Sequence, residues 1–202
     1  LGGLVSTETG SRYLADRVGG WSQGRLIVSG WQGRLSNSWQ VSRLELRLQT
    51  LSLQAEALAV DWRPGTLAKG RLDIDRLVLR RLSLQSATSD EPLRPPASLE
   101  LPWALNVGSL ELGELRLARQ PSGEDLVFRD LRAGWENRNG AHYLRKLSVL
   151  TPWGRVHGNG HVAEKPPFAL SADLELAAMF DAKNARIQAR AEGDLLRSRV
   201  RL

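Results

Sequence analysis

Pairs of apolar residues recur every five positions in the stretch Leu72-Asp73-Ile74-Asp75-Arg76-Leu77-Val78-Leu79-Arg80-Arg81-Leu82-Ser83-Leu84. Within a pair, one residue separates the two apolar side chains, which is the period of a β-strand with one apolar face. Between pairs the spacing is odd, so in a straight strand the next pair would face the opposite side of the sheet. Keeping every pair on one face requires a bulge, a bend or a turn between pairs. A strongly curved sheet would supply it.

The alternation of apolar and polar residues continues on both sides of this stretch. Further pairs are Leu26/Val28, Leu44/Leu46, Leu58/Val60, Leu110/Leu112, Leu115/Leu117, Leu126/Phe128, Leu147/Val149, Leu170/Ala172 and Ile187/Ala189. Turn residues separate them: Gly30, Gly33, Pro64-Gly65, Gly70, Gly108, Gly113, Pro121-Ser122-Gly123, Asn139-Gly140 and Gly158-Asn159-Gly160. Short strands with frequent turns predict a mainly β protein built on a curved antiparallel sheet, in which consecutive strands are neighbours.

Three other regions complete the predicted organisation. We expect one short helix within residues 1–20, spanning about residues 6–20, because Gly19-Gly20 suits a helix end. Residues 21–202 are expected to form one elongated β domain, with a loop or linker at 86–98, where Ser and Pro accumulate. The first residues, 1–5, resemble the tail of a removed membrane anchor, and we expect the chain to be truncated at both ends.

A leucine-rich repeat is a competing explanation for the five-residue period. That architecture requires a unit of about 20–29 residues that recurs several times, with Asn or Cys after the Leu-x-Leu motif. Here Arg80-Arg81 occupy that position, and no such unit recurs. The sequence therefore favours the curved sheet.

The composition limits the classes of partner. The formal net charge is +6, but the basic residues are scattered between Leu residues and form no run of five or six. A nucleic-acid-binding protein concentrates its charge on one face or loop, so we expect no nucleic-acid partner. The chain has no Cys, which excludes disulfides and thiolate chemistry. It also lacks a stretch of 18 apolar residues, so no membrane-spanning helix is expected.

An enzymatic site has little support in the sequence. His157 and His161 have the spacing of a zinc-binding helix, but Gly158 and Gly160 lie between them and no Glu follows the first His. In an extended strand the two imidazoles would be about 13 Å apart, too far for one metal ion. We interpret them as solvated turn histidines. We expect no catalytic residues, no metal site and no cofactor.

The apolar faces and the Trp residues each allow two interpretations. Leu is less favoured in strands than Val, Ile or aromatic residues, yet it dominates the apolar positions. These Leu faces would suit either a closed core or a surface that meets disordered acyl chains, and the residues alone do not separate the two. The chain has seven Trp, mostly beside turns, which would pack at sheet rims or mark a membrane interface.

Four segments resemble parts of TamB-like proteins of the AsmA-like superfamily in order and spacing. Thr7-Glu8-Thr9-Gly10-Ser11-Arg12-Tyr13-Leu14 resembles the segment after the membrane anchor, and Gly24-x-x-x-Val28-x-Gly30-x-x-Gly33-x-Leu35 resembles the first hairpin. Residues 58–74 are similar to the family pattern of a strand ending in Trp62-Arg63-Pro64, a short turn with Leu67, then Gly70 and another strand. Residues 151–176 resemble a repeated Gly-to-strand unit. The resemblance covers about residues 6–178 and is densest over 7–85.

This resemblance implies a taco-shaped β-sheet with an apolar interior, forming the periplasmic part of a protein anchored in the inner membrane of a Gram-negative bacterium. It implies a role in outer-membrane biogenesis, in which phospholipid moves through the groove between the two membranes. The implied partners are phospholipids, the inner membrane and an outer-membrane barrel of the TamA type. The alternative is a scaffold or chaperone that assists outer-membrane protein assembly by offering sheet edges to incoming strands.

On this interpretation the groove is lined by apolar residues from several strands. The predicted lipid-facing residues are Leu44, Leu46, Leu48, Leu58, Val60, Leu72, Ile74, Leu77, Leu79, Leu110, Leu112, Leu115 and Leu117. Arg12, Arg17 and Arg25 would lie near the mouth, where each would attract anionic headgroups by about 1 kcal/mol.

Overall fold

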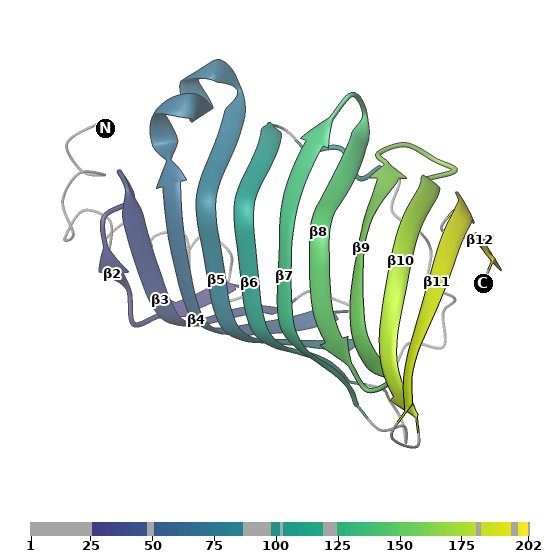
Figure 1. The fold of residues 1–202 in the computed structure, drawn as a ribbon. Coiled ribbons are helices and arrows are strands. Elements are labelled where there is room, and N and C mark those ends of the chain that lie inside the picture. The colour runs from purple at the N-terminus through teal and green to yellow at the C-terminus, as the bar shows by residue number, and fades with distance from the viewer. Residues whose placement is uncertain are drawn as a thin grey trace.

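The computed structural model describes residues 26–47, 51–86, 98–101, 103–118, 125–180, 183–194 and 198–201. The predicted N-terminal helix and most of the predicted loop at 86–98 lie outside these residues. Within them the prediction of a mainly β protein with a curved sheet is confirmed (Figure 1). No described helix is both long and apolar enough to cross a membrane.

The described strands form one twelve-stranded sheet. The elements are β1 (Leu26–Ser29), β2 (Gln32–Gly33), β3 (Ser38–Arg47), β4 (Leu51–Arg63), the 3₁₀ helix η1 (Pro64–Lys69), β5 (Arg71–Ser86), β6 (Ala104–Ala118), β7 (Leu126–Arg138), β8 (Ala141–Thr151), β9 (Gly154–Ala163), β10 (Ala169–Phe180), β11 (Lys183–Asp194) and β12 (Ser198–Arg201). Their order follows the chain from β1 to β12, except that β2 pairs with β3 outside this path. The sheet is therefore a meander, as the turn spacing predicts.

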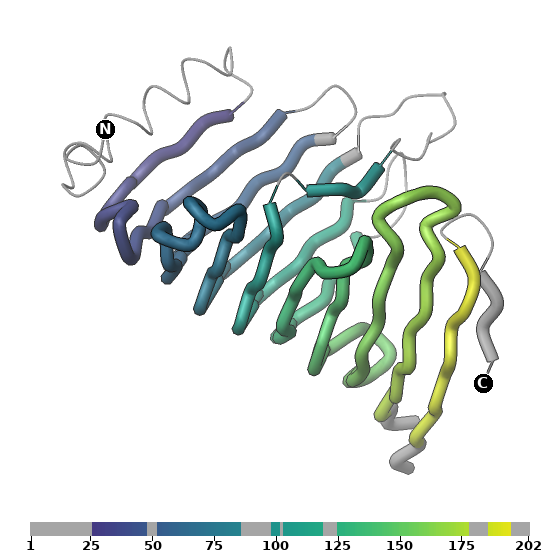
Figure 2. The backbone as a smooth tube through the Cα atoms, turned by 90° about the horizontal axis from the view of Figure 1, so that it is seen from above, coloured from purple at the N-terminus to yellow at the C-terminus, as the bar shows by residue number. Residues whose placement is uncertain are grey.

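One neighbouring pair departs from the antiparallel prediction. Strands β5 and β6 are parallel, with Arg71 opposite Ala104 at one end and Gln85 opposite Ala118 at the other. A parallel connection has to return along the whole strand, which a tight turn cannot do. The return is made by the segment between Ser86 and Ala104. Its described part, residues 98–101, lies above the hollow side of the sheet (Figure 2).

Two lines of bulges run across neighbouring strands and bend the sheet. We call the first line crease A. It consists of five residues that have no partner on the adjacent strand, although the residues on either side of them are paired: Ser42, Ala57, Arg80, Gly113 and Asp130. Crease B lies nearer the η1 end of the strands and contains Asp75, Gly108, Gly134 and Lys146. At crease A, and in β5, β6 and β8 at crease B, two consecutive residues face outward, so the outer surface gains length and the sheet curves toward the other side.

The creases explain the five-residue period in β5. Arg80 and Arg81 are consecutive, yet both reach Glu56 on the same face, at 3.4 and 3.3 Å. The apolar pairs Leu77/Leu79 and Leu82/Leu84, on either side of the two arginines, therefore face the same side of the sheet. Positive φ angles at Ala57, Asp130 and Lys146, of 51 to 52°, mark the same lines in β4, β7 and β8.

Several glycines predicted to lie in turns lie inside long strands instead. Gly108 and Gly113 are within β6, and the segment Gly158-Asn159-Gly160 is within β9. The predicted strands were consequently too short, since β5 has 16 residues and β6 has 15. The physical reason is the creases. A Cβ atom on Gly113 would lie 2.7 Å from the carbonyl oxygen of Arg80, so only glycine fits there.

We predict that Gly113→Ala lowers the free energy of unfolding by about 1–3 kcal/mol, because the added methyl group meets backbone that cannot move aside. Urea unfolding followed by circular dichroism measures the change. The matched control is Gly65→Ala in η1, where an added Cβ would have no neighbour within 4 Å. Equal stability of the two variants would contradict the role assigned to crease A.

Candidate functional site

Cross-strand pairing sorts the apolar residues into rows that share one face of the sheet, which we call the apolar face. One row contains Leu26, Leu46, Leu53, Leu84, Leu117 and Leu126, and the next contains Val28, Leu44, Ala55, Leu82, Leu115 and Phe128. Beyond crease A the rows continue with Val41, Leu58, Leu79, Leu112 and Leu131, and then with Trp39, Val60, Leu77, Leu110 and Ala133. The apolar face thus extends across the creases without a break.

The structure brings the predicted groove residues together on this face. Leu72 pairs with Leu105, and Ile74 pairs with Val107, in rows that follow those above. All predicted groove residues except Leu48 therefore share the apolar face. Leu48 lies outside the described residues, as do Arg12, Arg17 and Arg25, whose predicted position at the groove mouth stays a prediction.

The apolar face lines the concave side of the sheet. Val41, Val60, Val107 and Leu112 are nearly inaccessible, with 1 to 5% of their surface exposed. Most of the leucines around them are only half-buried. No helix or second sheet among the described elements lies against this face. The described part of the molecule is therefore an open, one-layered trough, and not a closed sandwich.

In β9 and β10 three inward positions carry small residues, while Leu170 and Leu174 of β10 also face inward. In β9 and β10 the inward positions include Gly158, Gly160 and Ala172, where β5 and β6 carry Leu. Small side chains leave more room above the backbone. A cavity of about 620 Å³ occupies this space. Its lining is almost entirely apolar and comes from Leu99, Leu101, Trp135, His142, Tyr143, Leu144, Leu147, Asn159, Gly160, His161, Val162, Leu170, Ala172 and Leu174.

Residues 98–101, which precede β6, close one side of this cavity. The amide of Leu99 donates to the carbonyl of Glu164 at 2.8 Å, and the carbonyl of Leu99 lies 2.8 Å from Nε2 of His142. These contacts hold Leu99 and Leu101 above the apolar face. The sequence motifs did not predict this cavity, although Gly160 and Ala172, two small residues paired across β9 and β10, were a signal for it.

The opposite, convex face carries the charges. Glu114 lies at its centre and accepts from Arg81 at 3.1 Å and from Arg116 at 3.2 Å, with Arg129 at 3.9 Å. Arg76 donates to Glu111 at 3.0 Å in the same way. Many of the described basic residues are therefore arranged in ion pairs, across strands as in Arg81–Glu114 and within a strand as in Arg116–Glu114.

These contacts shift the pKa values of the two carboxylates. The hydrogen bond from Arg76 lowers the pKa of Glu111. Partial desolvation raises the pKa of Glu114, but the charges and hydrogen bonds of Arg81 and Arg116 outweigh it, so the pKa of Glu114 is lowered. Both carboxylates therefore favour the charged form in the folded chain.

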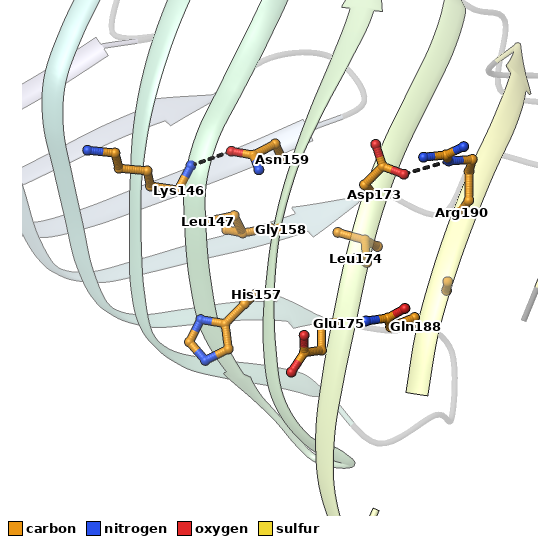
Figure 3. Close-up of a pocket in the computed structure, with 11 residues that line it drawn as sticks. Lys146, Leu147, His157, Gly158, Asn159, Asp173, Leu174, Glu175, Gln188 and Arg190 are labelled. Carbon is orange, nitrogen blue, oxygen red and sulfur yellow. Dashed lines mark hydrogen bonds and ion pairs between the residues drawn. The ribbon is translucent and has the colours of Figure 1, made fainter. Parts of the chain in front are cut away.

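A shallow polar hollow of about 910 Å³ is lined by residues of β8 to β11 (Figure 3). Nε of Arg190 donates to Asp173 at 2.6 Å, and the side-chain oxygen of Asn159 accepts from the amide of Lys146 at 2.8 Å. The charged and amide groups are thus partly satisfied by one another. Their arrangement provides no nucleophile with an adjacent base.

The histidines are placed differently from the prediction. His157 and His161 lie within strand β9 and not in a turn, because the Gly158-Asn159-Gly160 segment is extended. His161 stacks on Tyr143 with ring centroids 5.4 Å apart. Among the described residues, no group of three His, Cys, Asp or Glu side chains is placed to hold a metal ion.

We predict that the melting temperature falls from neutral pH to about pH 3 less steeply in Glu114→Gln than in the wild-type chain. A lowered folded-state pKa stabilises the folded chain above the unfolded-state pKa, and this stabilisation is lost as pH falls through the folded-state pKa. Thermal unfolding across this pH range measures the difference, which should shrink at high ionic strength. Parallel pH profiles at low salt would contradict it.

Comparison with protein-family models, with curated proteins and with solved structures finds no match to this chain. The resemblance to TamB-like proteins therefore rests on the sequence motifs given above. The function is inferred from the geometry and the charge of the molecule.

Proposed function

We propose that the chain is the membrane-proximal, periplasmic portion of a TamB-like envelope protein, and that its apolar face carries phospholipid acyl chains between the inner and outer membranes. One observation supports this most directly: among the described elements no helix or second sheet covers the concave apolar face, and only residues 98–101 lie over part of it. Transfer of each methylene from water onto such a surface is favourable by about 0.8 kcal/mol. An acyl chain would therefore cover surface that the described strands leave open to water.

The separation of apolar and charged faces supports the same proposal. Charged side chains on the convex side are held in ion pairs, for example around Glu114 and Glu111. The concave side presents half-buried leucines with flexible side chains. A broad surface without specific polar contacts would bind acyl chains without fixing them in place. Headgroups would remain in water along the open mouth.

The cavity beneath Leu99 and Leu101 adds a confined site to this open surface. Its volume of about 620 Å³ lies within the range of about 300–1,000 Å³ that is typical of small-molecule sites. Its lining is apolar, so it would accept hydrocarbon. On this proposal the protein is not an enzyme, and its partners are phospholipids, the inner membrane and an outer-membrane barrel of the TamA type.

We predict that Leu77→Arg abolishes the binding of phospholipid to the 202-residue chain, because it places a charge in the middle of the apolar face. The matched control is Val78→Arg, the same change at the next position of β5, where the side chain points to the convex face. Native mass spectrometry of the purified proteins measures bound phospholipid. Circular dichroism establishes that both variants fold. Equal lipid binding by the two folded variants would contradict the groove.

The edge of the sheet favours a second candidate function. Strand β12 pairs only with Arg190–Gly193 of β11, so Lys183–Ala189 of β11 have no described strand on that side. An open strand edge is able to pair with an incoming strand. A scaffold for the assembly of outer-membrane proteins would use this edge and not the apolar face.

Photo-crosslinking distinguishes the two functions. With a photoreactive amino acid at Leu46, on the apolar face, we expect phospholipid adducts in a bacterial envelope preparation. With the same probe at Gln188, on the β11 edge, we expect no nascent polypeptide adducts. Polypeptide adducts at Gln188 without lipid adducts at Leu46 would favour the scaffold function.

A further inference from the structure

Three tryptophans at the N-terminal end of the apolar face carry buried indole N–H groups with no acceptor. Trp31 and Trp39 are stacked, with ring centroids 4.9 Å apart and an angle of 14° between the planes. Trp39 is opposite Val60 in β4, and Trp62 follows two residues later on the same face. Within the described residues, none of the three indole nitrogens has a hydrogen-bond partner, and each of these nitrogen atoms is buried.

This arrangement needs an explanation because an indole N–H only donates and is costly to bury unpaired. Buried donors in folded proteins are almost always satisfied, and a cluster of unsatisfied donors indicates an acceptor that belongs to a ligand or to water. Trp39 and Trp62 come from the neighbouring strands β3 and β4, and Trp31, just before β2, stacks on Trp39, so the three donors adjoin one continuous apolar surface. The matching ligand therefore combines oxygen acceptors with hydrocarbon.

A row of apolar residues leads from this cluster along the groove. It contains Trp62, Ile74, Val107, Trp135 and Leu144, paired in turn from β4 to β8. Leu144 and Trp135 line the apolar cavity at its far end. Four strand spacings correspond to about 19 Å. One leaflet of the roughly 30 Å hydrocarbon core of a bilayer is about 15 Å deep, so the row is long enough for one acyl chain.

We propose that the indole N–H groups of Trp31, Trp39 and Trp62 bind the ester carbonyl oxygens of a glycerophospholipid whose acyl chain lies along this row. The inference rests on the proposed function and adds a specific site to it: the ester region is fixed at the tryptophans, and the acyl chain ends toward the cavity beneath Leu99. Tryptophan takes the same position at the interface of a bilayer, with its ring in the apolar region and its N–H toward the polar groups.

The test compares ester and ether lipids of identical headgroup and chain length. The wild-type 202-residue chain is offered an equimolar mixture of a diacyl phosphatidylglycerol and its dialkyl ether analogue in mixed micelles, and native mass spectrometry measures the ratio bound. We expect about a tenfold preference for the diacyl lipid, equivalent to about 1.4 kcal/mol. The ether analogue keeps the hydrocarbon and the phosphate and lacks only the carbonyl acceptors.

A variant with Trp31→Phe, Trp39→Phe and Trp62→Phe keeps aromatic rings and removes the donors. We expect it to bind both lipids equally, whereas Trp153→Phe should keep the preference, because Trp153 is 59% exposed in the turn between β8 and β9.

Equal binding of the two lipids by the wild-type chain would overturn the tryptophan site and leave the groove standing. Binding of neither lipid would overturn both proposals. Because the wild-type comparison needs no variant, failure of the triple variant to fold does not affect the result.

Discussion

The alignment of bulges across neighbouring strands is the constraint on which the rest of the molecule depends. A single bulge in one strand would reverse the face of every later side chain in that strand and break the apolar rows. Here Ala57, Arg80, Gly113 and Asp130 stand at the same level of four adjacent strands, so all four change phase together. The apolar rows therefore stay continuous across the four strands, and the sheet bends at crease A.

Electrostatics reinforces this alignment from the convex side. Glu56, Arg81, Glu114 and Arg129 are paired in turn across β4 to β7, directly beside crease A. Alternating charges in one row attract across each strand boundary. A slip of one strand by a single residue would place Arg81 away from Glu114 and expose Leu79 or Leu82. The polar and the apolar faces therefore specify the same register.

The sequence predicted the curved sheet because the five-residue period in β5 is incompatible with a straight strand. It also predicted which apolar residues lie on the same face, since the same period identifies the pairs that must share one; that this face binds lipid stays a prediction. It misplaced Gly108, Gly113 and the Gly158-Asn159-Gly160 segment, because glycine inside a strand and glycine in a turn give the same local signal. The parallel β5–β6 pair was missed for a different reason. Strand partners are chosen by contacts between distant residues, and the alternation within a strand carries no information about its direction.

The sizes of the inward side chains help to distinguish two roles for the trough: a surface that carries lipid, or one side of a hydrophobic core that a second sheet would complete. A core that awaits a second sheet would be expected to present interlocking, β-branched side chains of uniform depth. The apolar face instead has Gly160 and Ala172 set among the leucines of β8 and β10, so its depth is greater at the cavity beside Leu144 than over β5 and β6. A partner sheet of regular shape would leave part of that depth empty, and empty space forfeits packing energy. Flexible hydrocarbon adapts to a floor of changing depth, and on the proposed function this difference in depth would let an acyl chain enter over the leucines and end among the small residues.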